Sequence, residues 1–394
     1  MSDFRGEVRA WLEANCPASM RSPCRGEAEW VWGGRRARFF SDDARLWLER
    51  MAARGWTAPT WPRQYGGGGL APDEATILDE ELRRIDARAP LKSFGLWMLG
   101  PVLLEFGSEE QRAEHLPKIV RGEIRWCQGY SETGAGSDLA ALETRAVRDP
   151  SDDRTWIVDG HKIWTSHADK ADWMFCLVRT DASATKHEGI SFLLFDMQSP
   201  GVSVVPIRLI SGASPFCQTF FDGVRVPAAN LVGRPGQGWT IAKALLKHER
   251  ALIAQARDTA TAEEEPLEAM ARRYDVLGDP LLRDRVTQAN LDSLCFTLTL
   301  RRSAETAQSR GQPGPESSMQ KLYGTELNKR RKELRVAIAG YRGIGWEEPG
   351  FAPEELQLVR DWLRSRANSI EGGTSEIQLN IIARRVLGLG DGRS

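Results

Sequence analysis

Two glutamates occupy positions from which a carboxylate could act as a general base. Glu371 lies in "NSIEGGTSEIQ" (residues 368–378), ahead of two glycines and a predicted helix start. Glu249 lies in "GWTIAKALLKHERALIAQA" (residues 238–256), where apolar residues recur at i, i+4 steps and form one stripe that includes the glutamate. A desolvated carboxylate has a raised pKa and can take a proton from a substrate near neutral pH.

Each glutamate also has an ordinary structural interpretation. A carboxylate on a buried stripe is costly unless it is paired or functional, so Glu249 either performs chemistry or forms a salt bridge to another helix. Glu371 follows the pattern of a solvated loop carboxylate. We predict that Ser375 and Gln378 form a capping box, which would fix the register of the helix after the glycines.

Two further segments combine glycines, hydroxyls and an aromatic ring. "SETGAGSDL" (residues 131–139) is a flexible turn whose backbone N–H groups could approach a flavin or a phosphate closely, although such a loop is often only a loop. "KIWTSH" (residues 162–167) places a tryptophan beside two hydroxyls on a predicted strand. His167 is interpreted as a solvated or structural histidine and not as a catalytic one.

The composition of the chain limits the number of domains and the class of protein to which these residues can belong. The chain has 394 residues, 41% hydrophobic and 27% charged, with a formal net charge of -1, so two or three soluble domains are expected. That balance does not favour nucleic acid or an anionic membrane, and the basic run "NKRRKELR" (residues 328–335) is interpreted as a helix face or subunit contact. The six cysteines have no CxxC or metal spacing, which predicts reduced thiols, no metal site and a cytoplasmic protein. We find no signal peptide and no membrane span in the sequence.

The periodicity predicts an α+β chain in three parts. Residues 1–122 have helical spacing, including a helix capped by Ser108 and Gln111. Residues 123–235 form short β-branched and aromatic runs typical of an antiparallel barrel or sandwich, and Asp159-Gly160 predicts a hairpin turn there. Residues 236–394 are helical again and are predicted to form a four-helix bundle.

The order and spacing of several motifs resemble the acyl-CoA dehydrogenase family over most of the chain. The motifs are "GWTAPTWPRQYGG" (55–67), "GYSETGAGSDLAALETRA" (129–146), "VDGHKIWTSHADKADW" (158–173), "GISFLLFD" (189–196), "FFDGVRVPAANLVG" (220–233) and "GGTSEIQLNIIARRVLGL" (372–389). The resemblance implies FAD held between the β domain and the C-terminal helices. It also implies α,β-dehydrogenation of an acyl-CoA, with electrons passed on to an electron-transferring flavoprotein.

The resemblance assigns roles residue by residue. The cofactor-binding residues it implies are Tyr130, Ser131, Gly136, Ser137, Trp164, Thr165, Ser166, Gly373, Thr374 and Glu376. Ser137 and Arg250 are implied to contact the acyl-CoA. Where the family has proline after the loop glutamate, this chain has Thr133, and His167 takes a place often held by asparagine.

The family's usual base precedes a single glycine, whereas this chain has "EGGTS". In the register set by Thr374 and Ser375, the usual base position is Gly372, and Glu371 falls one residue early. Members of the isovaleryl and long-chain type carry their catalytic glutamate at a helix position that matches "KHERALIA" (residues 247–254). We therefore expect Glu249 to be the base, with Glu371 as the weaker alternative and Gly372 leaving room for a bulky acyl group.

Two motifs that family homotetramers lend to a neighbour's flavin are missing or degraded. No Arg-x-x-Phe-Gly is present, because the corresponding region reads "MARRYDVLGDPLLRD" (270–284), and the Gln-x-x-Gly-Gly-x-Gly region reads "VAIAGYRGIG" (336–345). The chain most closely resembles the large subunit of heteromeric pimeloyl-CoA or steroid-side-chain enzymes. An α2β2 heterotetramer with a homologous subunit is expected, otherwise a homotetramer or homodimer.

Three functions remain open from the sequence. The favoured function is dehydrogenation of a bulky acyl-CoA, with a steroid side chain or a dicarboxylic chain. The alternatives are a flavin oxidase on the same fold and a non-catalytic partner subunit of a heteromeric acyl-CoA dehydrogenase.

Overall fold

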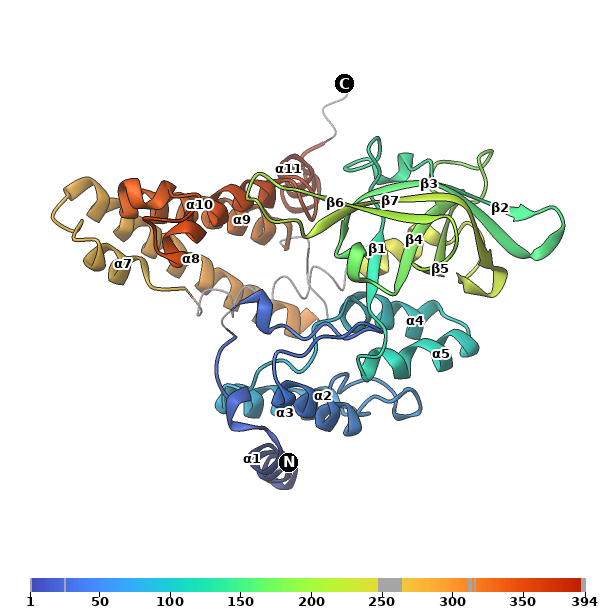
Figure 1. Cartoon of the computed structure of the whole chain (residues 1–394), viewed down its shortest axis with the longest axis horizontal. Coiled ribbons are helices and arrows are strands. Elements are labelled where there is room, and N and C mark those ends of the chain that lie inside the picture. The colour runs from blue at the N-terminus through green and yellow to red at the C-terminus, as the bar shows by residue number, and fades with distance from the viewer. Residues whose placement is uncertain (1, 25, 247–263, 311–313, 315–316, 391–394) are drawn as a thin grey trace. The chain divides into compact units, whose positions relative to one another are not determined.

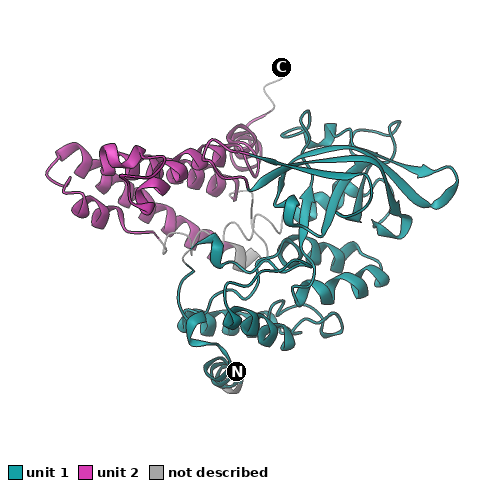
Figure 2. Ribbon diagram, viewed as in Figure 1, with its two compact units in different colours: residues 1–207, 215–252 teal, residues 208–214, 253–394 magenta. Residues whose placement is uncertain are grey.

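The computed structural model describes residues 2–24, 26–246, 264–310, 314 and 317–390 (Figure 1). Glu249 and Arg250 lie outside the described residues. The chain divides into two compact units, one of Met1–Ile207 with Pro215–Leu252 and the other of Arg208–Ser214 with Ile253–Ser394 (Figure 2). The short segment 208–214 therefore belongs with the second unit, although the chain on both sides of it belongs with the first.

The first part of unit 1 is helical, as predicted. The helices are α1 (Ser2–Asn15), α2 (Asp42–Ala53), α3 (Pro72–Arg84), α4 (Gly100–Phe106) and α5 (Glu109–Val120), with a π-helical turn at Gly95–Leu99. The predicted capping box of α5 is confirmed, because Gln111 N–H donates to Ser108 Oγ and Ser108 N–H donates to Gln111 Oε1. Apolar faces of these helices share one core with the inner face of the sheet.

The sheet of unit 1 has eight strands and is mostly antiparallel. The strands are β1 (Trp126–Gly129), β2 (Arg145–Asp149), β3 (Asp152–Ser166), β4 (Trp173–Arg179), β5 (Ile190–Asp196), β6 (Val202–Ile207), β7 (Phe216–Pro227) and β8 (Leu231–Val232). Their order is β6-β7-β3-β2-β4-β5-β8, and β1 pairs in parallel with β4. A second apolar cluster fills the other face of the sheet.

The hairpin predicted at Asp159-Gly160 is wrong. β3 runs straight through these residues, and the pairing of β3 with β7 shifts register between Val158 and Gly160. A Cβ on Gly160 would lie 2.7 Å from Thr144 Cα, and Asp159 accepts a hydrogen bond from Gly223 N–H. The glycine therefore serves a bulge and a close strand contact, which use the same residue types as a turn.

Unit 2 is helical. Its helices are α7 (Leu267–Arg273), α8 (Pro280–Arg310), α9 (Ser317–Ala339), α10 (Pro353–Ser365) and α11 (Ser375–Ile381). α9 is the central helix, because α7, α8, α10 and α11 all pack against it. The predicted class, with helices at both ends and a sheet between them, is confirmed, whereas the domain boundaries at 122 and 235 stay predictions. Along the described ranges, no helix is both long and apolar enough to cross a membrane.

Candidate active site

The last residues of β3 depart from regular strand geometry. The pairing with β7 passes from Lys162–Thr219 to Thr165–Cys217, so one extra residue is inserted in β3 between these pairs. Within this bulge, Trp164 has φ +60, a left-handed conformation that is uncommon for a bulky side chain. Its side chain is 53% exposed, and its ring contacts Phe216 at 6.1 Å between centroids. The bulge therefore exposes the Trp164 indole, which does not belong to the hydrophobic core.

The residues beside Trp164 are buried or half-buried. Thr165 is fully buried, and its Oγ1 has no hydrogen-bond partner among the residues that the structure describes. Ser166 is half-buried. An unpaired buried hydroxyl costs free energy unless a bound group or a water forms a hydrogen bond with it. The end of β3 can therefore form a further hydrogen bond to a ligand or a water.

The loop after β1 lies beside this strand end. Tyr130 is buried, with its ring edge-on to Phe175 and Phe192, and Ser131 accepts a hydrogen bond from Ile163 N–H at 2.9 Å. Glu132 and Ala135 exchange backbone hydrogen bonds, which closes a tight turn. The loop is thus fixed to β3 one residue before Trp164.

A buried ion pair holds the base of this loop. Lys162 Nζ lies 2.7 Å from Glu132 Oε1, and the two side chains are 0% and 4% exposed. Lys162 also donates to the Tyr130 carbonyl, and Glu132 accepts from the N–H groups of Glu143 and Thr144. Burial raises the pKa of Glu132, but the charge of Lys162 and the hydrogen bonds outweigh burial, so the net pKa is lowered.

Sequence reasoning missed this pair. A signal was available in the alternation of side chains along β3. Trp156, Val158 and Lys162 all point to its buried face, which puts a lysine among apolar residues. A buried lysine requires a carboxylate partner, and Glu132 is one of two acidic residues in the adjoining loop, the other being the exposed Asp138.

The tip of the loop is open. Gly136 and Ser137 are exposed, and a Cβ added to Gly134 or Gly136 would meet nothing within 4 Å. Neither glycine has a positive φ, so neither backbone conformation nor internal packing demands them. Thr133, in the place of the family's proline, is tethered by a 2.9 Å hydrogen bond to His161.

In unit 2 the "EGGTSE" segment begins helix α11. Gly372 and Gly373 have φ +63 and +89, the left-handed region that favours glycine. The N-cap is Thr374, whose Oγ1 accepts from Ile377 N–H at 3.3 Å. The predicted capping box of Ser375 and Gln378 is therefore wrong: adjacent threonine and serine can both cap, and the helix begins one residue earlier than predicted.

Glu371 is engaged locally. Its carboxylate lies 2.8 Å from Arg364 and accepts from Asn368 Nδ2 at 2.6 Å, and its side chain is 42% exposed. A base for carbon acids needs desolvation, which this position does not supply. Among the described residues, a Cβ on Gly372 would meet nothing within 4 Å except the Lys321 side chain, at 4.0 Å.

Glu376 lies in the first turn of α11 and is exposed. Hydrogen bonds from its own backbone N–H and from Thr374 lower the pKa of Glu376, so it is ionised at neutral pH. Tyr130, Ser131, Gly136, Ser137, Trp164, Thr165 and Ser166 are thus gathered in unit 1, and Gly373, Thr374 and Glu376 lie in unit 2.

His167 is held in place by its backbone and by a ring contact. It has φ +54, its N–H donates to the Pro215 carbonyl at 2.8 Å, and its ring packs on Trp32. Burial and the charge of Arg125 lower the pKa of His167, so it is neutral at physiological pH. Across the described ranges, no group of His, Cys, Asp and Glu side chains is arranged to hold a metal ion.

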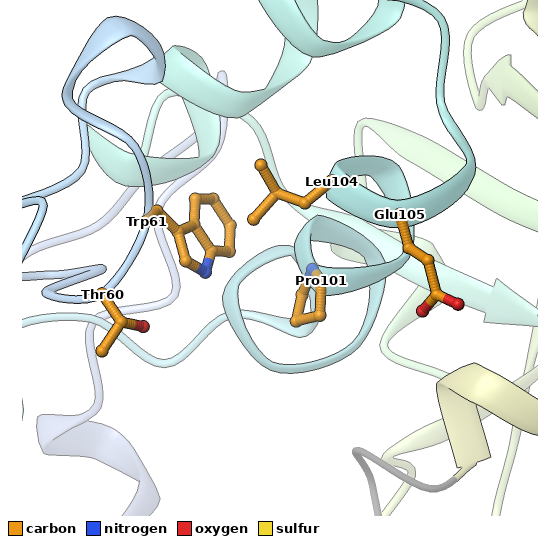
Figure 3. A pocket seen from close by; sticks show the side chains of 5 residues that line it. All are labelled: Thr60, Trp61, Pro101, Leu104 and Glu105. Atoms are coloured by element: carbon orange, nitrogen blue, oxygen red, sulfur yellow. The ribbon is translucent and has the colours of Figure 1, made fainter. Parts of the chain in front are cut away.

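A separate depression of about 490 Å³ lies elsewhere in unit 1. Thr60, Trp61, Pro101, Leu104 and Glu105 line it (Figure 3). None of these residues belongs to the loop of residues 131–139 or to the end of β3. Because the depression is shallow and carries no converging polar groups, we assign it no role.

The residues of unit 1 fit a flavin. Among the residues that the structure describes, an exposed indole on a bulge, a buried hydroxyl without a partner and two glycines that face open space supply an apolar surface, a hydrogen-bonding group and accessible backbone. These are the elements that a fused planar ring with a phosphate tail requires.

The chain is similar to known proteins over nearly its whole length. Three profiles match in order: "Acyl-CoA dehydrogenase, N-terminal domain" over residues 2–123, the middle domain over 127–224 and the C-terminal domain over 236–387. Acyl-CoA dehydrogenase IpdE1 of Mycobacterium tuberculosis is 37% identical over 394 residues, covering 99% of this chain and 98% of that protein.

Solved structures give the same result. The Tcur3481-Tcur3483 steroid ACAD has a TM-score of 0.77 at 31% identity, covering 99% of this chain and 97% of that one. The ChsE4-ChsE5 complex of Mycobacterium tuberculosis has a TM-score of 0.72 at 27% identity, covering 99% and 98%. The three matching domains and the relatives similar over their whole length place this chain in the acyl-CoA dehydrogenase family, a family of flavoprotein enzymes of fatty acid and steroid degradation.

Proposed function

We propose that this chain is the flavin-holding subunit of a heteromeric, FAD-dependent acyl-CoA dehydrogenase that acts on a bulky acyl group, such as a steroid side chain or a dicarboxylic chain. The observation that carries the proposal is the strand end and loop of unit 1. Trp164 is displayed in the open on a bulge, beside a loop that the Glu132–Lys162 ion pair fixes. Strained backbone of this kind is found mainly at functional sites, and we attribute it here to the binding of a ring-shaped ligand.

The proposed roles follow from the family resemblance. Trp164 lies against the ring, Thr165 and Ser166 hydrogen-bond its polar edge, and the loop of Tyr130, Ser131, Gly136 and Ser137 holds the ring face and the phosphates. Gly373, Thr374 and Glu376 contribute from the start of α11. When bound, FAD supplies the hydride acceptor for the β-carbon of the acyl group.

Glu249 is the proposed base, and Arg250 and Ser137 are proposed to contact the CoA. The base must hold the α-proton after removal, which requires a carboxylate whose pKa is raised by burial. Glu371 supports this assignment indirectly, because Arg364 and Asn368 already occupy its carboxylate. The Glu371 carboxylate is therefore held in a local ion pair and hydrogen bond at the surface of unit 2.

A homologous subunit is the proposed partner, and an electron-transferring flavoprotein is the proposed acceptor. The support is the lack of an Arg-x-x-Phe-Gly motif in the sequence, together with the similarity to the Tcur3481-Tcur3483 steroid ACAD and to the ChsE4-ChsE5 complex, each named as a pair of proteins. The first test is the visible spectrum of the chain purified alone and co-expressed with a homologous subunit. Bound FAD only in the co-expressed complex is expected; a flavin-loaded, active homotetramer from the chain alone would contradict the heteromer.

The second test assigns the base within that complex. Glu249→Gln should lower kcat by about 10²- to 10⁴-fold without loss of flavin, since general-base catalysis contributes that much. Glu371→Gln, the matched control, should change kcat by less than about tenfold, or about 1.4 kcal/mol. Full activity of Glu249→Gln would instead make this chain the non-catalytic partner. Fast reaction of the reduced flavin with oxygen would indicate an oxidase.

A further inference from the structure

We infer that five half-buried rings of unit 1 form an aromatic shelf that binds the fused or alicyclic rings of the acyl group. The shelf consists of Trp30, Trp32, Phe94, Trp97 and His167. The inference rests on the proposed function, because it names the part of the substrate that this side of the site selects.

The rings form a continuous network drawn from three separate segments. Trp32 is at its centre, with ring centroids 6.1 Å from Trp30, 5.7 Å from Phe94, 6.5 Å from Trp97 and 5.0 Å from His167. Phe94 and Trp97 contact each other at 6.4 Å. The interplanar angles run from 53° to 76°, so the rings present a mixture of faces and edges.

Core packing does not explain Trp30 and Trp32, two of the three tryptophans of this network. Trp30 has an extended backbone conformation, and its neighbour Val31 is buried in the core, with a carbonyl that accepts from Lys92 N–H at 2.7 Å. Side chains alternate along an extended segment, so Trp30 and Trp32 project from the opposite face, where both are half-buried. Two indoles on the side away from the core form an apolar surface that a ligand can cover.

The shelf is continuous with the proposed flavin site. His167 directly follows Ser166, and its left-handed conformation turns the chain so that its ring meets Trp32. The shelf also includes the entrance to the π-helical turn Gly95–Leu99, since Phe94 is its N-cap and Trp97 lies within it. π-Helical turns occur often at functional sites.

Charges on the shelf favour an apolar occupant over an ionic one. The guanidinium of Arg125 lies 4.7 Å from the Trp32 ring, and Lys92 Nζ lies 3.1 Å from the Trp30 ring. Glu27 is 3.6 Å from His167 Nε2, so charges of both signs flank the rings. These cations already occupy one face of each indole, and the remaining faces and edges suit C–H groups.

The shape of the shelf selects a ring system rather than a straight chain. Rings of mixed orientation from three segments make a broad surface, and a fused alicyclic group covers more of it than a single alkyl chain does. The gain follows buried apolar area at roughly 25 cal/mol per Å². The 31% identical structure titled a steroid ACAD agrees with this class of substrate.

The test compares two ligands on the co-expressed complex. Calorimetry measures binding of butyryl-CoA and of the CoA thioester of a steroid side-chain acid, and kcat/KM is measured for both. Trp32→Leu should weaken steroid-acyl binding at least about tenfold, leave butyryl-CoA within about twofold, and keep flavin content unchanged, tenfold being about 1.4 kcal/mol. Trp32→Phe should recover most of the loss.

Trp11→Leu is the matched control. Trp11 is also half-buried among rings, 6.1 Å from Trp47 and 4.7 Å from Trp56, but none of these belongs to the shelf. Equal losses for both ligands, or the same loss in Trp11→Leu, would overturn the shelf. If Trp32→Leu does not fold, Trp30→Leu tests the same surface.

The two proposals fail in different ways. A complex that binds no flavin or dehydrogenates neither thioester contradicts the proposed function, while calorimetry still reports on the shelf. A complex that dehydrogenates both thioesters with a selectivity that Trp32→Leu does not alter contradicts the shelf alone.

Discussion

Two glycine-containing loops, each with a glutamate, carry the candidate site, and they are held in different ways. In unit 1, Glu132 is paired with Lys162 where side-chain exposures are 4% and 0%. In unit 2, Glu371 is paired with Arg364 where side-chain exposures are 42% and 33%. The loop of unit 1 is held by an ion pair in the protein interior, whereas the loop of unit 2 is held by an ion pair at the protein surface.

This difference separates scaffold from contact surface. A buried pair is strongly destabilising to break because it leaves an uncompensated charge, whereas an exposed pair is worth little. The loop of unit 1 therefore has its shape before any ligand arrives. The loop of unit 2 depends on two left-handed glycines and one capping threonine. The predictions below test that contrast.

Breaking the buried pair should have the largest effect on stability. Lys162→Met leaves the Glu132 carboxylate buried without its cation, and we expect the free energy of unfolding to fall by about 3–5 kcal/mol. Urea denaturation of the purified complex measures this. The control is Lys186→Met in the neighbouring exposed pair with Asp138, where side-chain exposures are 50% and 62%. Similar losses in both variants would remove the contrast between the two loops.

The same pair should give a pH-dependent contribution. Because the pKa of Glu132 is lowered from 4.5 in the folded protein, its stabilisation is complete above that value and is lost as the pH falls below it. The difference in unfolding free energy between wild type and Glu132→Gln should therefore shrink from pH 7 to pH 4. Urea denaturation at both pH values measures the difference. A constant difference would mean that Glu132 acts through its shape and not its charge.

Relieving the bulge should cost little stability but weaken flavin binding. Trp164→Gly removes a left-handed tryptophan, and the relief of about 1–3 kcal/mol offsets the lost ring contact with Phe216. We expect the melting temperature of the flavin-free protein to be unchanged or higher, and FAD retention on gel filtration to fall. Trp126→Ala, in the core at 1% exposure, should instead lose about 3–5 kcal/mol. Full FAD retention by Trp164→Gly would mean that the exposed indole has no part in the flavin site.

The smallest effect is expected in unit 2. Arg364→Ala removes the cation beside Glu371, and the pair is exposed, so the free energy of unfolding should change by less than about 1 kcal/mol. Urea denaturation checks this, with Arg272→Ala on α7 as the comparison, since its pair with Glu268 is also exposed. A loss as large as that of Lys162→Met would show that the second loop is anchored as firmly as the first.

Local signals in the sequence predicted local structure well. The Ser108–Gln111 capping box is complete within four residues and forms as expected. Asp159-Gly160 misled because a bulge and a turn use the same residue types, and only the partner strand β7 decides between them. The cap at Thr374 was missed by one residue because Ser375 satisfies the same rule.

Interactions between distant segments were harder to predict. Considered singly, Glu132 and Lys162 each suit a solvent-exposed position. The alternation of side chains along β3, which puts Lys162 on the buried face, indicates otherwise. The shelf rings come from residues 30–32, 94–97 and 167, which only the fold brings together. The order of helices and sheet followed from periodicity and from the family resemblance, whereas the roles of Glu249 and the cofactor residues stay predictions.

The segment Arg208–Ser214 has a consequence for biosynthesis. It leaves the ribosome between β6 and β7, but the unit it joins is completed only by the C-terminal helices, and Gly212 packs beside Trp346. At about 5–20 residues per second, the segment waits for seconds before that tryptophan exists. A C-terminal fragment that begins after β7 therefore lacks residues 208–214 of unit 2. The order of translation also favours formation of the sheet first, before the long β6–β7 connection can pack against the helices of unit 2.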